Sequence, residues 1–211
     1  ERTMQIFKGN TVVAEYKVSD VDSVKFIEKT TAEVEINGII WATRNVDAPG
    51  TFATTPESAG MFYQWNRKVG WSSTDPMVNT NGGTTWDDST PSGTEWEAAN
   101  DPCPAGWRVP SLEEIKSLLN TTYVSNKWTT YLVVNGRMFT DKTTGASLFL
   151  PAAGYRSNGG GTLYGTGTFG LYLSSTQSGS LNAYHLDFRS DYAGWLSSSR
   201  SFGFSVRCVK E

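Results

Sequence analysis

The sequence predicts an α+β fold with two helices, antiparallel sheets and long loops, preceded by a small β-hairpin. Three observations predict it. The composition combines 21 glycines with 13% aromatic and only 18% charged residues, a balance typical of a loop-rich domain with β-structure and few helices. Short apolar runs alternate with turn residues along most of the chain. Two segments show helical spacing of apolar residues. We expect a hairpin in residues 1–30 and the main domain in residues 31–211.

The first 29 residues contain three short apolar runs separated by turn residues. Residues 4–7 and 12–16 flank Lys8-Gly9-Asn10, which has the chemistry of a turn. Residues 23–27 are expected to form a third strand. Because a meander this small is barely stable alone, it should lean on the main domain or on a preceding domain.

The main domain is expected to begin with a strand over residues 33–41, in which Asn37-Gly38 is the strongest turn signal of the chain. A helix is predicted near residues 58–68, because four apolar residues recur there at helical spacing: Met61, Phe62, Trp65 and Val69. Residues 70–95 show no periodicity, and we expect a long surface loop pinned by its tryptophans.

The second helix follows Val109-Pro110, which is extended because proline disfavours the helical region for the residue before it. The Ser111 hydroxyl can accept from the amide three residues on, and Glu114 can reach back, as in a capping box. The buried face of this helix is predicted from its apolar residues at helical spacing: Leu112, Ile115, Leu118 and Leu119.

The second half of the chain is predicted to be mainly strands. A hairpin is expected around Asn135-Gly136, after a connector over residues 120–128. A strand that proline ends is predicted at residues 147–151, followed by a glycine-rich loop at 157–170. The closing strands are predicted at residues 171–175, 183–188 and 203–209, with a loop at 190–201 between the last two.

Charge and hydropathy argue against binding to nucleic acid and against a membrane span. The net charge is −3 and no basic run occurs, which disfavours binding to nucleic acid. No stretch of ~18 apolar residues is present, so we expect no membrane span. The chain begins at Glu1 without a signal peptide, and we expect it to be a processed or trimmed product.

Cys103 and Cys208 are the only cysteines. Two cysteines do not prove a disulfide, and two buried free thiols are the alternative. The polar, aromatic, loop-rich composition is typical of extracytoplasmic proteins, which favours a bond. Such a bond would tie the last strand to the segment that precedes the helix at 111–119.

His185 is the only histidine, so a zinc site or a Ser-His-Asp triad would have to use it. Strand alternation places Tyr184, Leu186 and Phe188 on one face. His185, Asp187 and Arg189 lie on the other. We expect His185 to be an exposed residue of a ligand surface rather than a catalytic group.

The aromatic residues of the last sixty positions have two interpretations. At least half are expected to pin long loops, according to general burial tendencies. The others lie beside serine, glycine and asparagine, the composition of adaptable binding surfaces in which Tyr, Trp and Arg dominate the contacts. The ligand-binding residues that we predict are Tyr155, Arg156, Tyr172, His185, Asp187, Arg189, Tyr192, Trp195 and Arg200. Trp107 and Arg207 are assigned to the scaffold.

Three segments resemble the Fibrobacter succinogenes major paralogous domain, a C-type-lectin-like family common on Bacteroidetes surfaces. They are residues 101–110 (DPCPAGWRVP), 150–156 (LPAAGYR) and 203–208 (GFSVRC). The resemblance covers residues 33–211 and departs at Leu173, where the family more often has tryptophan. It implies a lectin-like α+β domain, a Cys103–Cys208 disulfide and a binding module rather than an enzyme.

The expected function is therefore surface-exposed ligand binding or adhesion, with a host or bacterial surface protein or glycan as partner. A structural or tip subunit of a fimbria, partnered by fimbrial proteins or an upstream domain, is the first alternative. A polysaccharide-active enzyme is the second, but its paired carboxylates could only be Asp87/Asp88 or Asp187/Asp191, which lack a recognisable context. No cofactor is expected, and the calcium-binding motifs of sugar-binding lectins are missing. The expected location is extracytoplasmic, on the cell surface or outer membrane, as a lipoprotein or secreted protein.

Overall fold

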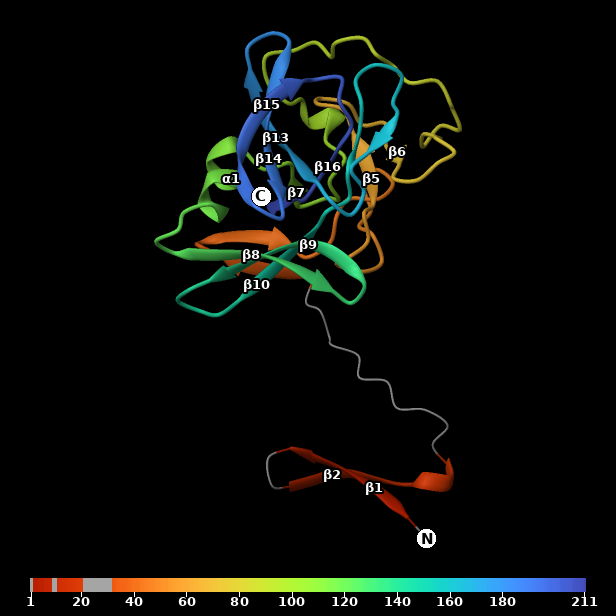
Figure 1. The fold of residues 1–211 in the computed structure, drawn as a ribbon, viewed down its shortest axis with the longest axis vertical. Helices are drawn as coiled ribbons and strands as arrows, with labels where there is room; N and C mark the ends of the chain where they lie inside the picture. Colours follow the sequence, from red (N-terminus) through yellow and green to blue (C-terminus); the bar gives the residue numbers. More distant parts are fainter. Residues whose placement is uncertain (1, 9–10, 21–31) are drawn as a thin grey trace. The chain divides into compact units, whose positions relative to one another are not determined.

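A computed structural model describes residues 2–8, 11–20 and 32–211. The chain divides into two compact units, residues 1–30 and residues 31–211, which we describe separately (Figure 1). In the first unit, β1 (Thr3–Lys8) and β2 (Thr11–Lys17) pair as an antiparallel hairpin, and the short 3-10 turn η1 (Val18–Asp20) follows. The third strand predicted at residues 23–27 lies outside the described residues.

The second unit consists mainly of strands. In its described residues, α1 (Leu112–Leu118) is the single α-helix, beside one 3-10 turn, η2 (Ala98–Asn100). The expected α+β fold with two helices is therefore wrong, and so is the lectin-like architecture that the family resemblance implied. None of the described helices has the length and apolarity that crossing a membrane requires.

The helix predicted near residues 58–68 is instead the strand β5 (Met61–Tyr63) followed by a turn. Gly60 has a φ of +65° and Asn66 a φ of +53°, so the backbone leaves the right-handed helical region at both ends. Phe62, Tyr63 and Trp65 are all fully buried. Because the segment is surrounded by protein, its apolar residues carry no information about a single helical face.

Six strands form the largest sheet, in the order β15-β14-β13-β16-β5-β6 (Figure 1). Antiparallel pairing joins its first three strands, whereas β13 and β16 run parallel. The bounds are β6 (Trp71–Ser72), β13 (Gly170–Ser178), β14 (Asn182–Arg189), β15 (Tyr192–Ser199) and β16 (Phe204–Ser205).

A four-stranded sheet in the order β3-β4-β17-β7 joins the two ends of the second unit. Its strands are β3 (Glu33–Ile36), β4 (Ile39–Ala42), β7 (Trp107–Arg108) and β17 (Val209–Lys210). The predicted turn at Asn37-Gly38 is confirmed, and both residues have positive φ. Cys103 and Cys208 form a disulfide with a Cα–Cα distance of 6.1 Å beside this sheet, so the closing bond is also confirmed.

The three-stranded sheet β10-β9-β8 differs from the expected hairpin around Asn135-Gly136. The turn instead lies at residues 132–133, where Leu132 has a φ of +54°, and Asn135 pairs with Thr130 within the strands. The bounds are β8 (Val124–Tyr131), β9 (Val134–Asp141) and β10 (Ser147–Pro151). Two short strands, β11 (Tyr155–Arg156) and β12 (Leu163–Tyr164), pair nearby.

The predicted cap of α1 is confirmed. The Ser111 hydroxyl accepts from the Glu114 amide, and the Glu114 carboxylate accepts from the Ser111 amide at 2.7 Å. Arg108 then donates to both Glu114 oxygens, at 2.8 and 2.6 Å. The first turn of α1 is therefore bonded through Glu114 to Arg108 of the preceding strand, β7.

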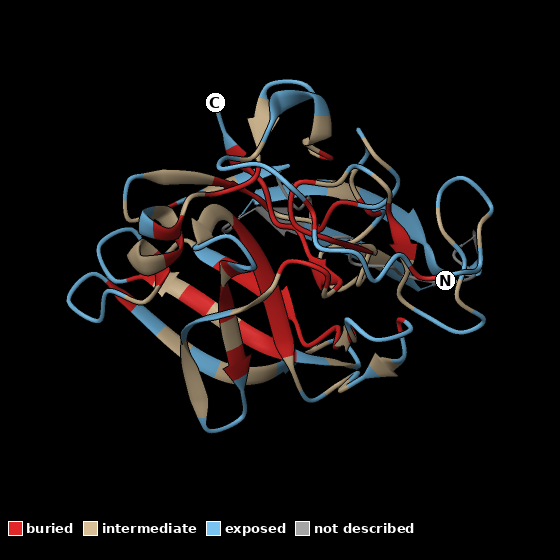
Figure 2. Cartoon of the chain, turned by 90° about the horizontal axis from the view of Figure 1, so that it is seen from above, coloured by how far each residue is buried: buried red, intermediate tan, exposed pale blue. Residues whose placement is uncertain are grey.

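Buried side chains form two hydrophobic clusters, one on each face of the six-stranded sheet. Tyr172, Leu186 and Phe188 pack in one cluster with Ile115 and Leu118 of α1. The neighbouring positions of the same strands belong to the other cluster, which contains Leu171, Leu173, Ala183, Phe204 and Cys208. Successive residues of a strand point to opposite faces, so β13 and β14 are covered on both sides. Figure 2 shows the buried residues along such strands and in loops at the centre of the molecule, with the outermost loops exposed.

Candidate ligand-binding site

A hollow of about 180 Å³ opens on the face of the six-stranded sheet opposite α1. Aromatic side chains predominate in its lining, which consists of Tyr155, Phe169, Leu171, His185, Asp187, Leu196, Ser198, Phe202 and Phe204. We refer to these nine residues as the closing-strand hollow. They come from β11, β13, β14, β15, β16 and the segments beside them, so regular strands hold most of the walls.

Strand register explains why these residues meet. His185 on β14 lies directly opposite Leu173 on β13 and Leu196 on β15. Opposite residues of paired strands share a face of the sheet, and this face continues two residues on at Asp187. The predicted alternation of β14 is therefore confirmed, with His185 and Asp187 on one face and Leu186 and Phe188 on the other.

The aromatic walls pack closely against one another. Phe204 is the centre of this packing, with ring centroids 4.7 Å from His185, 5.6 Å from Phe202 and 6.2 Å from Tyr155. Tyr155 also meets Phe202 at 5.9 Å. Interlocked rings of this kind restrict one another, so the hollow has preformed walls.

His185 is buried, with 1% of its surface exposed, so the expectation of an exposed residue is wrong. The position faces the second hydrophobic cluster rather than solvent. Burial lowers the pKa of His185 to about 4, against a smaller opposing effect of a hydrogen bond with the Ala183 backbone. The imidazole is therefore neutral at pH 7. Its Nδ1 has no hydrogen-bond partner among the described residues.

Asp187 is the acidic group of the hollow and is half-buried. Burial raises the pKa of its carboxyl, and the nearby charge of Arg189 opposes that change. Arg189 itself pairs with Asp191 at 3.1 Å and lies 5.5 Å from the centre of the Tyr192 ring. Asp187 is thus a desolvated carboxylate whose neighbouring cation is shared with a second acid.

Arg156 and Arg200 do not belong to a ligand surface, because both are buried and their guanidinium groups bind loop carbonyls. Arg156 donates to the carbonyls of Ser72, Thr74 and Gly161 at 2.7–2.8 Å. Arg200 donates to those of Pro91, Gly93 and Gly179 at 2.8–3.2 Å and lies over the Trp65 ring at 4.0 Å. They hold the loop segments at residues 72–75, 91–93, 161 and 179.

Tyr172 and Trp195 lie on the other face of the sheet. Tyr172 is buried, stacks on Phe188 at 5.8 Å and donates to the Pro151 carbonyl. Trp195 is 43% exposed and lies between Tyr184, at 5.6 Å, and the Lys116 ammonium of α1, at 5.1 Å. The nine predicted residues therefore do not form one surface, and three of them, Tyr155, His185 and Asp187, line the hollow.

Sequence reasoning missed six of the lining residues: Phe169, Leu171, Leu196, Ser198, Phe202 and Phe204. Alternation along β15 could have indicated Leu196 and Ser198, because both lie at the same parity as Tyr192. The phenylalanines gave no such signal. The turn after β15 decides which face Phe202 and Phe204 reach, and Phe169 lies in the loop before β13.

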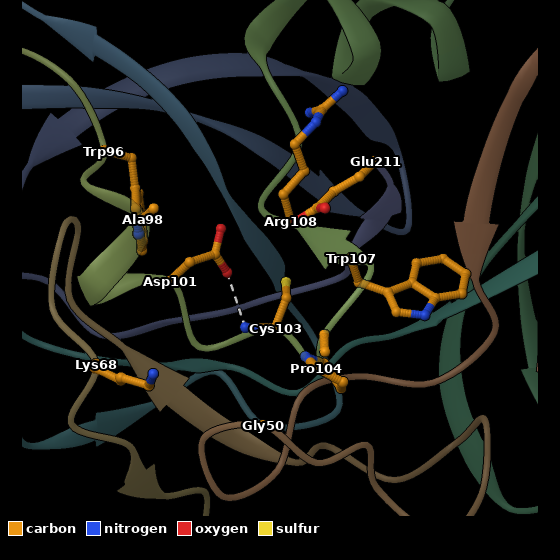
Figure 3. Close-up of a pocket in the computed structure, with 11 residues that line it drawn as sticks. Gly50, Lys68, Trp96, Ala98, Asp101, Cys103, Pro104, Trp107, Arg108 and Glu211 are labelled. Carbon is orange, nitrogen blue, oxygen red and sulfur yellow. Dashed lines mark hydrogen bonds between the residues drawn. The ribbon is translucent and has the colours of Figure 1, made fainter.

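A second hollow, of about 560 Å³, lies beside the disulfide (Figure 3). Trp96, Trp107 and four charged residues are among its lining: Lys68, Asp101, Arg108 and Glu211. The Asp101 carboxylate accepts from the amides of Cys103 and Val109 at 2.8 and 3.1 Å, and Arg108 is held by Glu114. Asp101 and Arg108 are therefore already engaged in local structure, and we take the closing-strand hollow as the candidate site.

Comparison with known proteins adds a partial family match. The family described as Domain of unknown function (DUF8237) matches residues 137–209, from β9 to β17. The match includes all nine residues of the closing-strand hollow, but not Cys103 or α1. No curated protein and no solved structure matches the chain. In the described residues, no group of three His, Cys, Asp or Glu side chains could hold a metal ion.

Proposed function

We propose that the second unit is a non-catalytic binding module that recognises a protein or glycan through the closing-strand hollow. The observation that carries this proposal is a half-buried carboxylate, Asp187, placed among interlocked aromatic rings on a rigid sheet. Binding sites are commonly apolar hollows with a few polar groups that orient the ligand. A structural hollow would gain nothing from a carboxylate whose charge burial disfavours.

The dimensions indicate the size of the recognised group. A volume of about 180 Å³ is below the ~300 Å³ at which pockets for drug-sized ligands begin, so the hollow would take one side chain or one sugar ring. Leu196 is 47% exposed on its rim. The rest of a larger ligand would therefore lie over β15 and the adjoining loops.

Support for binding rather than catalysis comes from His185. An efficient general base has a pKa near the operating pH, whereas burial lowers that of His185 to about 4. Asp191, the nearest second carboxylate along the chain, is paired with Arg189 and largely exposed. The pair therefore does not resemble two carboxylates that flank a cleft.

We further propose an extracytoplasmic location, which the Cys103–Cys208 bond supports because disulfides persist in oxidising compartments. The relationship to the Fibrobacter succinogenes major paralogous domain is part of the same proposal. It rests on the three sequence segments alone, which lie around the disulfide, β10 to β11 and β16.

Filling the hollow tests the function. Ser198→Trp would place a large ring inside it, and the neighbouring Ser197→Trp would place the same ring on the opposite face. The full chain and both variants would be screened on a glycan array and on an array of secreted and cell-surface proteins. We expect the wild type and Ser197→Trp to bind the same target and Ser198→Trp to lose it. Binding that Ser198→Trp retains, or binding to no arrayed target, would contradict the proposal.

A further inference from the structure

We propose that an extended segment of a partner protein adds to the free edge of β15 as a seventh strand and inserts an arginine or lysine side chain into the closing-strand hollow, toward Asp187. This inference rests on the proposed function and specifies its ligand class. Two independent features carry it, the open edge of the sheet and the acidic charge within the hollow.

β15 is the outermost strand of the six-stranded sheet and pairs with β14 alone over residues 192–199. Among the described residues, no backbone hydrogen bond from another segment reaches residues 192–198. A strand exposes half of its N–H and C=O groups on the side without a neighbour. β15 therefore presents a template for an added strand.

Natural proteins usually protect such an edge with charged residues, proline, a bulge or a very short strand. β15 reads Tyr-Ala-Gly-Trp-Leu-Ser-Ser-Ser, which contains no charge and no proline, and its pairing with β14 is regular over eight residue pairs. In contrast, the hairpin turn before it carries the ion pair of Arg189 and Asp191. An uncharged edge of this length is suited to strand addition.

The hollow reaches this edge. Leu196 and Ser198 of β15 form its outer wall, so alternate side chains of an added strand would lie directly beside them. Asp187 is paired with Gly194, so in that row of the sheet no Cβ stands between the carboxylate and the edge. The Tyr192 ring lies over Gly194, in the space that a side chain at position 194 would occupy. A Cβ built on Gly194 would collide with the Tyr192 hydroxyl.

The distance selects a long side chain. Asp187 lies on the second strand from the edge, so an added strand would run about 10 Å from β14 at the usual strand spacing. Short side chains cannot span that gap. Arginine and lysine can lay an apolar stem along Leu196 and Tyr192 and bring their charge to the carboxylate.

Charge favours the same choice. The groups on this side of the hollow are Asp187, Asp191 and Arg189, with a sum of −1, and His185 is neutral at pH 7. A cation is also attracted to aromatic faces, of which Tyr155, Phe202 and Phe204 supply three. A glycan could use the rings and the carboxylate, but it would leave the backbone groups of β15 unpaired. The protein segment is therefore the ligand that uses both features.

The test uses capped nine-residue peptides of alternating threonine and valine with arginine, lysine, glutamine or glutamate at the centre. Binding to the full chain would be measured by calorimetry. We expect arginine and lysine peptides to bind at least about tenfold more tightly than the glutamine peptide, and the glutamate peptide to bind most weakly. Equal affinities for all four would overturn the proposal.

Two further arms separate the edge from the charge. Asp187→Asn keeps the shape of the side chain and should reduce the arginine preference to within about threefold, whereas Glu113→Gln, the same change on an exposed residue of α1, should leave it intact. Peptides N-methylated at odd or at even residues should differ, because alternate amides face the same neighbour. One set should bind and the other should not.

The outcomes distinguish this inference from the proposed function. If no peptide binds but a glycan binds in a manner that Ser198→Trp abolishes, the seventh strand is refuted and the binding hollow stands. If arginine peptides bind equally to the wild type and Asp187→Asn, the carboxylate is not their target and the inference fails. If the two N-methylated sets bind equally, the edge of β15 is not used and the inference also fails.

Discussion

Breaking the bond between Cys103 and Cys208 should lower the free energy of unfolding by about 4–5 kcal/mol. The two cysteines are 105 residues apart in the sequence. By chain-entropy reasoning, a cross-link that closes a loop of this length removes about 16 cal/mol/K from the unfolded chain, which is ~4.8 kcal/mol at 25 °C. With an unfolding entropy of about 2.1 cal/mol/K per residue and roughly 180 residues, Tm should fall by about 13 °C.

The variant of choice is Cys103→Ala, studied with a reductant to keep Cys208 from forming other bonds. Cys208 is fully buried, whereas Cys103 is partly exposed, so removing Cys103 breaks the cross-link without opening a cavity in the second hydrophobic cluster. Calorimetry and urea unfolding would be compared with the oxidised wild type. The matched variant Cys208→Ala should lose more, because it adds a cavity. A Cys103→Ala protein that melts within about 3 °C of the oxidised wild type would refute the reasoning.

Three further predictions concern stability. Burial lowers the pKa of His185 to about 4 from an unfolded value near 6.5, so the unfolded chain binds the extra proton as pH falls through that window. Acidification from pH 7 to 5 should therefore reduce the free energy of unfolding by roughly 2 kcal/mol, and His185→Gln should remove this share of the pH dependence in urea titrations. Gly170→Ala should destabilise the protein by about 1–3 kcal/mol or more, because the new Cβ would meet the Phe188 ring, whereas Gly159→Ala has open space and should change Tm little. Ser111→Ala should cost about 1 kcal/mol through loss of the helix cap, and an unchanged urea midpoint would contradict that role.

Features with local causes could be predicted from the sequence. The start of α1 depends on Pro110, Ser111 and Glu114, which interact within five residues, and the structure shows the expected cap. The Asn37-Gly38 turn likewise needs only its own two residues. The two faces of β14 followed from strand alternation, which placed His185 and Asp187 together.

Features decided by long-range contacts could not be predicted. The segment around Phe62 has helical spacing, but pairing with β16 and β6 makes it a strand. Phe62, Tyr63 and Trp65 are all buried, so the helical periodicity was misleading. The turn predicted at Asn135-Gly136 does not form for the same reason. β9 pairs with β8 and with β10, and this dipeptide lies within the paired strand.

The candidate site was predicted only in part for the same reason. Alternation gives the relative orientation of neighbouring residues, but not which face a sheet leaves open. Trp195 and His185 therefore belong to opposite faces, although both were expected in one surface. Arg156 and Arg200 were predicted to belong to the ligand surface because they are charged residues in aromatic segments. Most of the carbonyls that each binds come from distant parts of the chain, so the sequence does not indicate them.

The two buried arginines have a consequence for the variability of the loops that they bind. Arg156 and Arg200 hold those loops largely by main-chain oxygens, which every amino acid supplies. Three side chains, those of Ser72, Asp75 and Gln177, also accept from them. At an anchored position such as Thr74 the side chain can thus be exchanged while the course of the loop persists, whereas Gly93, Gly161 and Gly179 have positive φ and favour glycine. At such positions the course of the loop is set independently of the side chain that the anchored residue carries.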